Sequence, residues 1–159
     1  MSLKVDFTVA AVAERDGRFL LVQERAARRV VLNQPAGHLE DGESLLQAVV
    51  REAREETGRT FVPQSLLGLY IWRGPGGRTI LRIAFSGIVG ECDESAPLDR
   101  AILRTLWLGR PELMARAAEH RSPLVLRCID DYLAGIRHPL TMLQYLPTDE
   151  LPRLAAAIR

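Results

Sequence analysis

The stretch from Gly37 to Gly58 constrains this chain more than any other part of its sequence. Ser44 is followed three residues later by Gln47, and this spacing has the form of a capping box, so a helix is predicted to begin near Ser44. Gly58 suits the left-handed backbone conformation in which many helices end. The sequence therefore predicts one helix between Ser44 and Gly58, entered from a loop that contains Gly37.

The predicted helix has an acidic face next to an apolar one. At about 100° per residue, Glu52, Glu55 and Glu56 fall on a common face. The residues of the neighbouring face, which is expected to meet a core, are Leu46, Val49, Val50 and Ala53. Carboxylates gathered on one face repel one another unless a cation lies among them, and Mg²⁺ bridges protein carboxylates to phosphates. Arg51 lies one turn before Glu55 and can hold a carboxylate in place.

A charged helix by itself is more typical of a solvated surface than of a site. The run 51–56 is different because it stands in register with Gly37, Glu43 and Gly58. Together these positions resemble the Nudix box: a glycine, five residues, a glutamate, seven residues, then Arg-Glu-apolar-any-Glu-Glu-any-Gly. The resemblance implies an α+β fold, a Nudix-like α/β/α sandwich with a mixed sheet and a loop-helix-loop catalytic motif. It also implies a Mg²⁺-dependent hydrolase of substituted diphosphates, with Mn²⁺ as an alternative metal.

The same resemblance implies roles for individual residues. Metal ligands would come from the backbone around Gly37 and from the side chains of Glu52, Glu55 and Glu56. Catalytic roles would fall to Arg51 and to Glu52 or Glu55 as the general base, a choice that the sequence leaves open. Many family members add a carboxylate from a distant loop, and the sequence does not choose among Glu91, Asp93, Glu94 and Asp99. The motif departs from the family at Arg59, where an apolar residue is usual, and we interpret this as a change in how the next strand packs.

The rest of the chain predicts strands around this helix and helices at the end. The predicted strands are 5–13, 18–23, 30–32, 66–72, 80–89 and 105–108, with turns at 16–17 and 74–77 and a loop over 33–37. The predicted helices are 110–119, 122–135 and 149–158. We expect one domain over residues 1–159, in which the residues after about 140 form a C-terminal extension.

Composition limits the partners and the compartment. A chain of 159 residues can bury a sizeable core. Its net charge of +1 gives no electrostatic reason to expect binding to nucleic acid or a membrane. Cys92 and Cys128 lack the spacing of a metal site, which predicts two free thiols in a reducing compartment. We therefore expect a cytoplasmic protein, monomeric or homodimeric, that acts on a small phosphoanhydride.

A narrower resemblance, to the NudJ-type phosphatases, covers roughly residues 5 to 140. It is carried by segment 32–40, by Leu81-Arg82 with Phe85, and by segment 121–140. It implies hydrolysis of nucleoside tri- and diphosphates, and of thiamine pyrophosphate or its hydroxymethylpyrimidine pyrophosphate precursor, with stepwise release of orthophosphate. The alternatives are a Nudix pyrophosphohydrolase of dinucleoside polyphosphates, nucleotide sugars or damaged nucleoside triphosphates, and a non-catalytic module that senses a nucleotide.

Several side chains are candidates for substrate contacts. Arg82 interrupts an otherwise apolar strand, and Arg25 ends the second strand; either guanidinium could bind a phosphate through two hydrogen bonds. Trp72 precedes the glycine-rich turn and could stack on a base or a pyrimidine. The remaining candidates are His38, Gln34 and Arg121.

Overall fold

The computed structural model describes residues 4–147, which form a seven-stranded sheet with helices on both faces. The strands are β1 (Val5–Arg15), β2 (Arg18–Ala26), β3 (Arg29–Asn33), β4 (Ala36–His38), β5 (Arg59–Arg73), β6 (Thr79–Cys92) and β7 (Ile102–Gly109). Their order is β3-β2-β1-β6-β5, with β4 paired to β1 and β7 paired to β2. Strands β1 and β6 run parallel and the other pairs antiparallel, so the predicted mixed sheet is confirmed.

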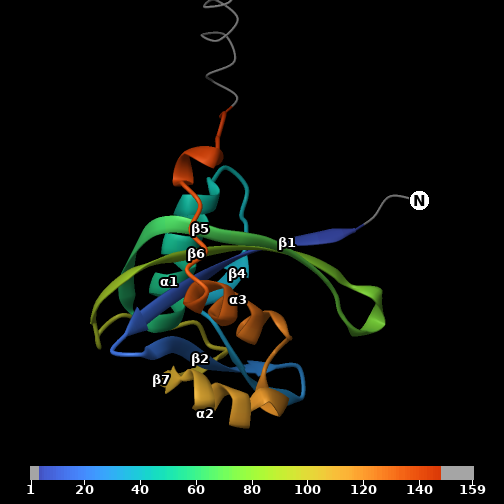
Figure 1. Cartoon of the computed structure of the whole chain (residues 1–159), viewed down its shortest axis with the longest axis vertical. Coiled ribbons are helices and arrows are strands. Elements are labelled where there is room, and N and C mark those ends of the chain that lie inside the picture. The colour runs from blue at the N-terminus through green and yellow to red at the C-terminus, as the bar shows by residue number, and fades with distance from the viewer. Residues whose placement is uncertain (1–3, 148–159) are drawn as a thin grey trace, which may run out of the picture.

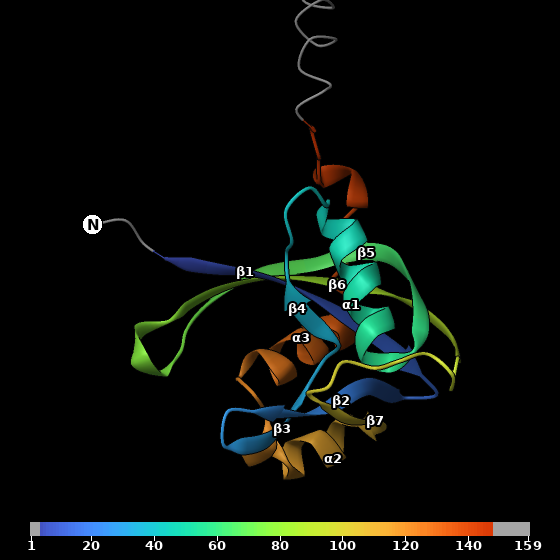
Figure 2. The ribbon, with the colours of Figure 1, turned by 180° about the vertical axis from the view of Figure 1, so that it is seen from behind.

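The helices complete the predicted sandwich. They are α1 (Leu45–Thr57), α2 (Arg110–Ala115) and α3 (Leu124–Leu133), with single 3₁₀ turns η1 (Pro75–Gly77), η2 (Ala117–Glu119) and η3 (Leu140–Met142). Helix α3 lies in front of the sheet in Figure 1, and α1 lies in front of it in the reverse view of Figure 2. Among the described helices, none has the length and apolar content needed to cross a membrane. The helix predicted over 149–158 lies outside the described residues.

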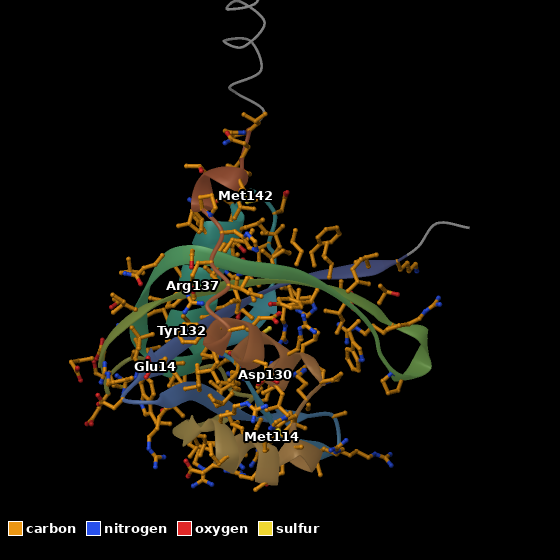
Figure 3. The ribbon with its side chains drawn as sticks, in the orientation of Figure 1. Glu14, Met114, Asp130, Tyr132, Arg137 and Met142 are labelled. Carbon is orange, nitrogen blue, oxygen red and sulfur yellow. The ribbon has the colours of Figure 1, made fainter. Side chains whose placement is uncertain are left out.

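Alternation along β1 divides the core into two layers. Successive side chains of a strand point to opposite faces, so Val9 and Ala11 join the cluster under α1 while Ala10 and Val12 join the cluster under α3. At the end of α3, Tyr132 meets the ring of Phe19 edge-on, with 5.4 Å between the ring centroids. The guanidinium of Arg137 lies 3.9 Å from the centroid of Tyr132, and Figure 3 shows the two side chains close together.

Both ends of α1 follow the prediction, but one face does not. The hydroxyl of Ser44 accepts a hydrogen bond from the backbone N–H of Gln47, and the side-chain oxygen of Gln47 accepts one from the backbone N–H of Ser44. At the other end, Gly58 adopts a left-handed φ of 66°. The prediction that Val50 faces the core is wrong, because its side chain is 38% exposed. The buried face is rotated toward the carboxylates and consists of Ala48, Val49, Ala53, Glu56 and Thr57.

Other boundaries also differ from the prediction. Ala36 and Gly37 were expected in a loop, yet together with His38 they form β4, which pairs with β1 from Thr8 to Ala10. Three residues are too few to show the alternation by which a strand is recognised. Strands β5 and β6 are longer than predicted, and the predicted helix 110–119 ends at Ala115 before resuming as η2.

Arg59, the position at which the motif departs from the Nudix pattern, contacts β6 and β7. Strand β5 begins at this residue, one position after the glycine that ends α1. The guanidinium of Arg59 donates to the carbonyl of Gly90 at 3.0 Å and lies 5.8 Å from the ring centroid of Trp107. A long cationic side chain therefore occupies a half-buried position where the family usually has an apolar one.

Candidate active site

A cavity of about 480 Å³ lies between α1, β4 and the central strands. This volume falls within the range of about 300–1,000 Å³ that is typical of small-molecule sites. The acidic part of its lining consists of Glu24, Glu40, Glu52, Glu55, Glu56 and Asp99, and the basic part of Arg51, Arg78, Arg82 and Arg121. All the glutamates that the motif singled out on α1 therefore face one cavity.

Gly37 and Glu52, which both line this cavity, lie directly against each other. A Cβ atom built on Gly37 would stand 2.1 Å from Cδ of Glu52, so a side chain at position 37 would displace the Glu52 carboxylate. The glycine of the motif thus lets the backbone of β4 approach the carboxylate of α1. Burial raises the pKa of Glu52, although hydrogen bonding to Arg51 opposes the rise.

Glu56 joins the end of α1 to β4. Its carboxylate accepts from the backbone N–H of Ala36 at 2.8 Å, and the residue is 6% exposed. Burial raises the pKa of Glu56 to about 8; the bond from Ala36 lowers it, and the charges of Glu24, Glu52 and Asp99 raise it further. Glu56 is thus a carboxyl group that the metal-free protein holds largely protonated at neutral pH.

Arg51 joins three carboxylates, one from the loop before α1 and two from α1 itself. It donates to Glu43 at 2.7 Å, to Glu52 at 2.8 Å and to Glu55 at 3.1 Å, which confirms the expected pair one turn apart. It also donates to the carbonyl of His38 at 2.9 Å. Glu43 accepts from the backbone N–H of Glu40 as well, so the first glutamate of the motif secures both Arg51 and the loop before α1.

Asp99 is the only one of the four distant-loop carboxylates that lines the cavity, within the part of the chain that the structure describes. Its backbone N–H donates to the carbonyl of Glu55 at 2.9 Å, which holds the loop against the end of α1. Asp93 is instead paired with Arg54 at 2.6 Å, and Glu91 lies 3.6 Å from Arg15. Of the four candidates, Asp99 is therefore the one that the structure places beside the α1 glutamates.

The donor set fits a divalent cation, although no three side chains of residues 4–147 are already gathered as ligands. In this arrangement the guanidinium of Arg51 pairs with both Glu52 and Glu55. The available donors are carboxylate oxygens, which hard cations such as Mg²⁺ prefer. Ionising the buried Glu52 and Glu56 together is unfavourable until a cation offsets their charge, so binding of a metal would release protons.

Six residues were candidates for substrate contacts, and the structure brings four of them to the cavity. These are His38, Trp72, Arg82 and Arg121. The side chain of Arg25 is exposed and lies outside the lining. Gln34 is buried beneath the lining, where it accepts from Arg82 at 3.1 Å and donates to the carbonyl of Val125 at 2.8 Å.

Several further residues of the lining were not anticipated from the sequence, among them Thr8, Glu24 and Asn33. Glu24 is 5% exposed and pairs with Arg121 at 2.8 Å. A signal for Glu24 was present, because it continues the period-two series of Leu20 and Val22, whose side chains face the interior. Thr8 and Asn33 carry no comparable signal.

Glu56 also leads us to expect a pH-dependent stability of the metal-free protein. Between the ordinary pKa of 4.5 and the folded-state value of about 8, the folded protein holds one proton more than the unfolded chain. The free energy of unfolding should therefore fall as pH rises through this window, by at most about 1.4 kcal/mol per pH unit. Urea unfolding in EDTA should show a shallower fall for Glu56→Gln; equal slopes would mean that Glu56 ionises normally.

Comparison with known proteins gives a consistent result. A NUDIX domain model matches residues 3–127. Phosphatase NudJ of Escherichia coli (strain K12) and of Shigella boydii serotype 4 (strain Sb227) are each 37% identical over 140 residues, which are 88% of this chain and 91% of the relative. A solved NUDIX hydrolase from Nitrosomonas europaea is 50% identical, with a TM-score of 0.87 over 90% of this chain and 98% of that one. The solution structure of the E. coli ORF135 protein is 25% identical, with a TM-score of 0.64 over 83% and 91%.

Proposed function

This chain belongs to the Nudix hydrolase family, and from that premise we propose that it is a Mg²⁺-dependent phosphohydrolase of nucleoside tri- and diphosphates that releases orthophosphate. Thiamine pyrophosphate and its hydroxymethylpyrimidine pyrophosphate precursor are further candidate substrates. The observation that carries the proposal is the convergence of the α1 glutamates, Gly37 and Asp99 on one cavity. The similarity of this chain to the NudJ phosphatases supports orthophosphate as the product.

The metal would be held by the carbonyl of Gly37 and by Glu52, Glu55 and Glu56, with Asp99 facing it from the loop. When bound, Mg²⁺ neutralises phosphoryl oxygens and makes a water more acidic. Arg51 holds Glu52 and Glu55 in position through hydrogen bonds of 2.8 and 3.1 Å.

We place the general base at Glu52. The side chain of Glu52 is 12% exposed and its carboxylate lies against the backbone of Gly37, so it is the deeper of the two candidate carboxylates. Glu55 is the less suited of the two because its side chain is 49% exposed. Glu52 accepts a proton from water as the water oxygen bonds to phosphorus, and the bond from phosphorus to the bridging oxygen breaks with that oxygen keeping the electron pair.

The product identifies the reaction. Purified protein with Mg²⁺ would be given nucleoside tri- and diphosphates, thiamine pyrophosphate, nucleotide sugars and dinucleoside polyphosphates, each with and without inorganic pyrophosphatase. We expect orthophosphate without the helper enzyme. Orthophosphate only with the helper would identify a pyrophosphohydrolase, and no turnover of any substrate with Mg²⁺ or Mn²⁺ would favour a nucleotide-sensing module.

A further inference from the structure

Two neighbouring residues, Thr8 on β1 and Arg82 on β6, form a part of the cavity that the proposed chemistry does not use. They are Cα partners in the parallel pairing of these strands, so their side chains lie side by side on one face of the sheet. Both line the cavity, and they are 8% and 5% exposed. We call this pair the cavity floor.

The guanidinium of Arg82 is held by two neutral oxygen acceptors. Asn33 donates its amide to the carboxylate of Glu24 at 3.2 Å, so its oxygen faces Arg82, also at 3.2 Å. Gln34 donates its amide to the carbonyl of Val125, so its oxygen faces Arg82 at 3.1 Å. Because carboxylates and carbonyls only accept, both amide orientations follow from their partners. Neither bond brings a negative charge to Arg82.

The charge around the floor is therefore not balanced. Glu24 is the carboxylate that accepts a hydrogen bond from Asn33, and it is already paired with Arg121 at 2.8 Å. Burial lowers the pKa of Arg82, yet a guanidinium stays protonated in proteins. One carboxylate thus faces two guanidiniums, and a buried charge that is not fully paired is unfavourable. An anion at the floor would supply the charge that is missing.

Two polar atoms of the floor also lack partners. Among the described residues, neither Nε of Arg82 nor Oγ1 of Thr8 has a hydrogen-bond partner, and both atoms are buried. Protein interiors rarely leave such atoms unpaired. An oxyanion could accept from Nε–H of Arg82 and from the hydroxyl of Thr8 together, which would pair both atoms and supply the missing charge.

We propose that Thr8 and Arg82 form a phosphoryl-binding subsite distinct from the part of the cavity that is lined by Glu52, Glu55 and Glu56. The inference rests on the proposed function, since a phosphoanhydride carries a second phosphoryl group beside the one attacked. The bound group is either that second phosphoryl or the orthophosphate released. Asn33 and Gln34 act as positioning residues that orient the guanidinium.

Thr8→Val is the sharper variant because it removes a hydroxyl that makes no hydrogen bond within the described structure. It should fold with unchanged or slightly greater stability, and it should weaken binding of inorganic phosphate by roughly two- to tenfold. Arg82→Gln should weaken it by roughly ten- to a hundredfold, as expected for a charge-assisted bond. The exposed Arg104→Gln is the matched control and should have no effect.

Binding would be measured by calorimetric titration of inorganic phosphate into the metal-free wild type and each variant in EDTA. In the wild type and in Thr8→Val, the side-chain Nε–H resonance of Arg82 would also be followed by NMR. These readouts do not need turnover, so failure of the proposed reaction would leave them intact. Unchanged phosphate binding in both variants would overturn the subsite. Weakened binding of adenosine or thiamine with unchanged phosphate binding would also overturn it, and would assign the floor to the organic group.

Kinetics then separates the two sources of the phosphoryl group. A raised KM for a nucleoside diphosphate in both variants would identify the second phosphoryl of the substrate. An unchanged KM with weaker inhibition by orthophosphate would identify the product. If neither quantity changes, the floor is not a phosphoryl subsite and ordered water satisfies its polar atoms.

Discussion

Glu56→Gln should lower kcat by about a hundredfold to ten-thousandfold, the range expected when a group essential to the chemistry is removed. The substituted amide oxygen can still accept from the backbone N–H of Ala36, which Glu56 does at 2.8 Å. It carries no charge for a cation, however, and the amide avoids the cost of protonating Glu56 on folding, which its burial near Glu24, Glu52 and Asp99 imposes at neutral pH. We therefore expect an inactive protein that is as stable as the wild type or more stable.

Three measurements test this expectation together: kcat over a range of Mg²⁺ concentrations, calorimetric Mg²⁺ affinity, and urea unfolding. Glu119→Gln is the control, because Glu119 lies on η2, outside the cavity lining, where it pairs with Arg116. Loss of activity with unchanged Mg²⁺ affinity would mean that Glu56 acts on the substrate or on water instead of the metal. Unchanged kcat would remove it from the site.

The part of the site on α1 could be predicted from the sequence because a helix converts spacing into direction. Once Ser44 and Gly58 define the helix, the relative directions of Glu52, Glu55 and Glu56 follow from 3.6 residues per turn. Gly37 could be predicted only by resemblance to the family. Its physical reason, the carboxylate of Glu52 lying on the backbone of β4, depends on a contact between two elements.

Arg82 was a phosphate-binding candidate from the sequence, but its pairing with Thr8 could not be predicted because it depends on strand register. Thr8 and Arg82 are 74 positions apart in the chain, and only the pairing of β1 with β6 places them side by side. A shift of one residue would turn one of them to the opposite face of the sheet. Asp99 poses the same problem in a loop: its place against α1 depends on one backbone bond to Glu55, which no local pattern encodes.

Arg51→Met should lower the free energy of unfolding of the metal-free protein by about 2 kcal/mol at neutral pH, because its ion pairs are partly buried and lie between exposed and fully buried pairs. Methionine keeps much of the apolar length of the side chain but removes the cation that pairs with Glu43 and Glu52 at 2.7 and 2.8 Å. The side chains of these two glutamates are 15% and 12% exposed, so water can solvate the released charges only in part. The carbonyl of His38 also loses its donor.

The dependence on conditions distinguishes this mechanism from a simple packing defect. Hydrogen bonding to Arg51 lowers the pKa of Glu43, and a carboxyl with a lowered pKa contributes stability that is lost as pH falls through that value. The difference between Arg51→Met and the wild type should therefore shrink at acidic pH, and Mg²⁺ should restore part of it by replacing one cation with another. Adding Glu43→Gln to Arg51→Met should recover stability for the same reason.

Urea unfolding in EDTA and in Mg²⁺ measures these differences, with Arg104→Met as the exposed control. That control should change stability by less than about 0.5 kcal/mol, as surface substitutions usually do. If Arg51→Met also loses less than about 1 kcal/mol, then solvent screens its ion pairs like those of an exposed surface. A loss that is insensitive to both pH and Mg²⁺ would point instead to packing of the arginine side chain. In the outcome we expect, the pairs of Arg51 hold the carboxylates of α1 together until a metal takes over part of that role.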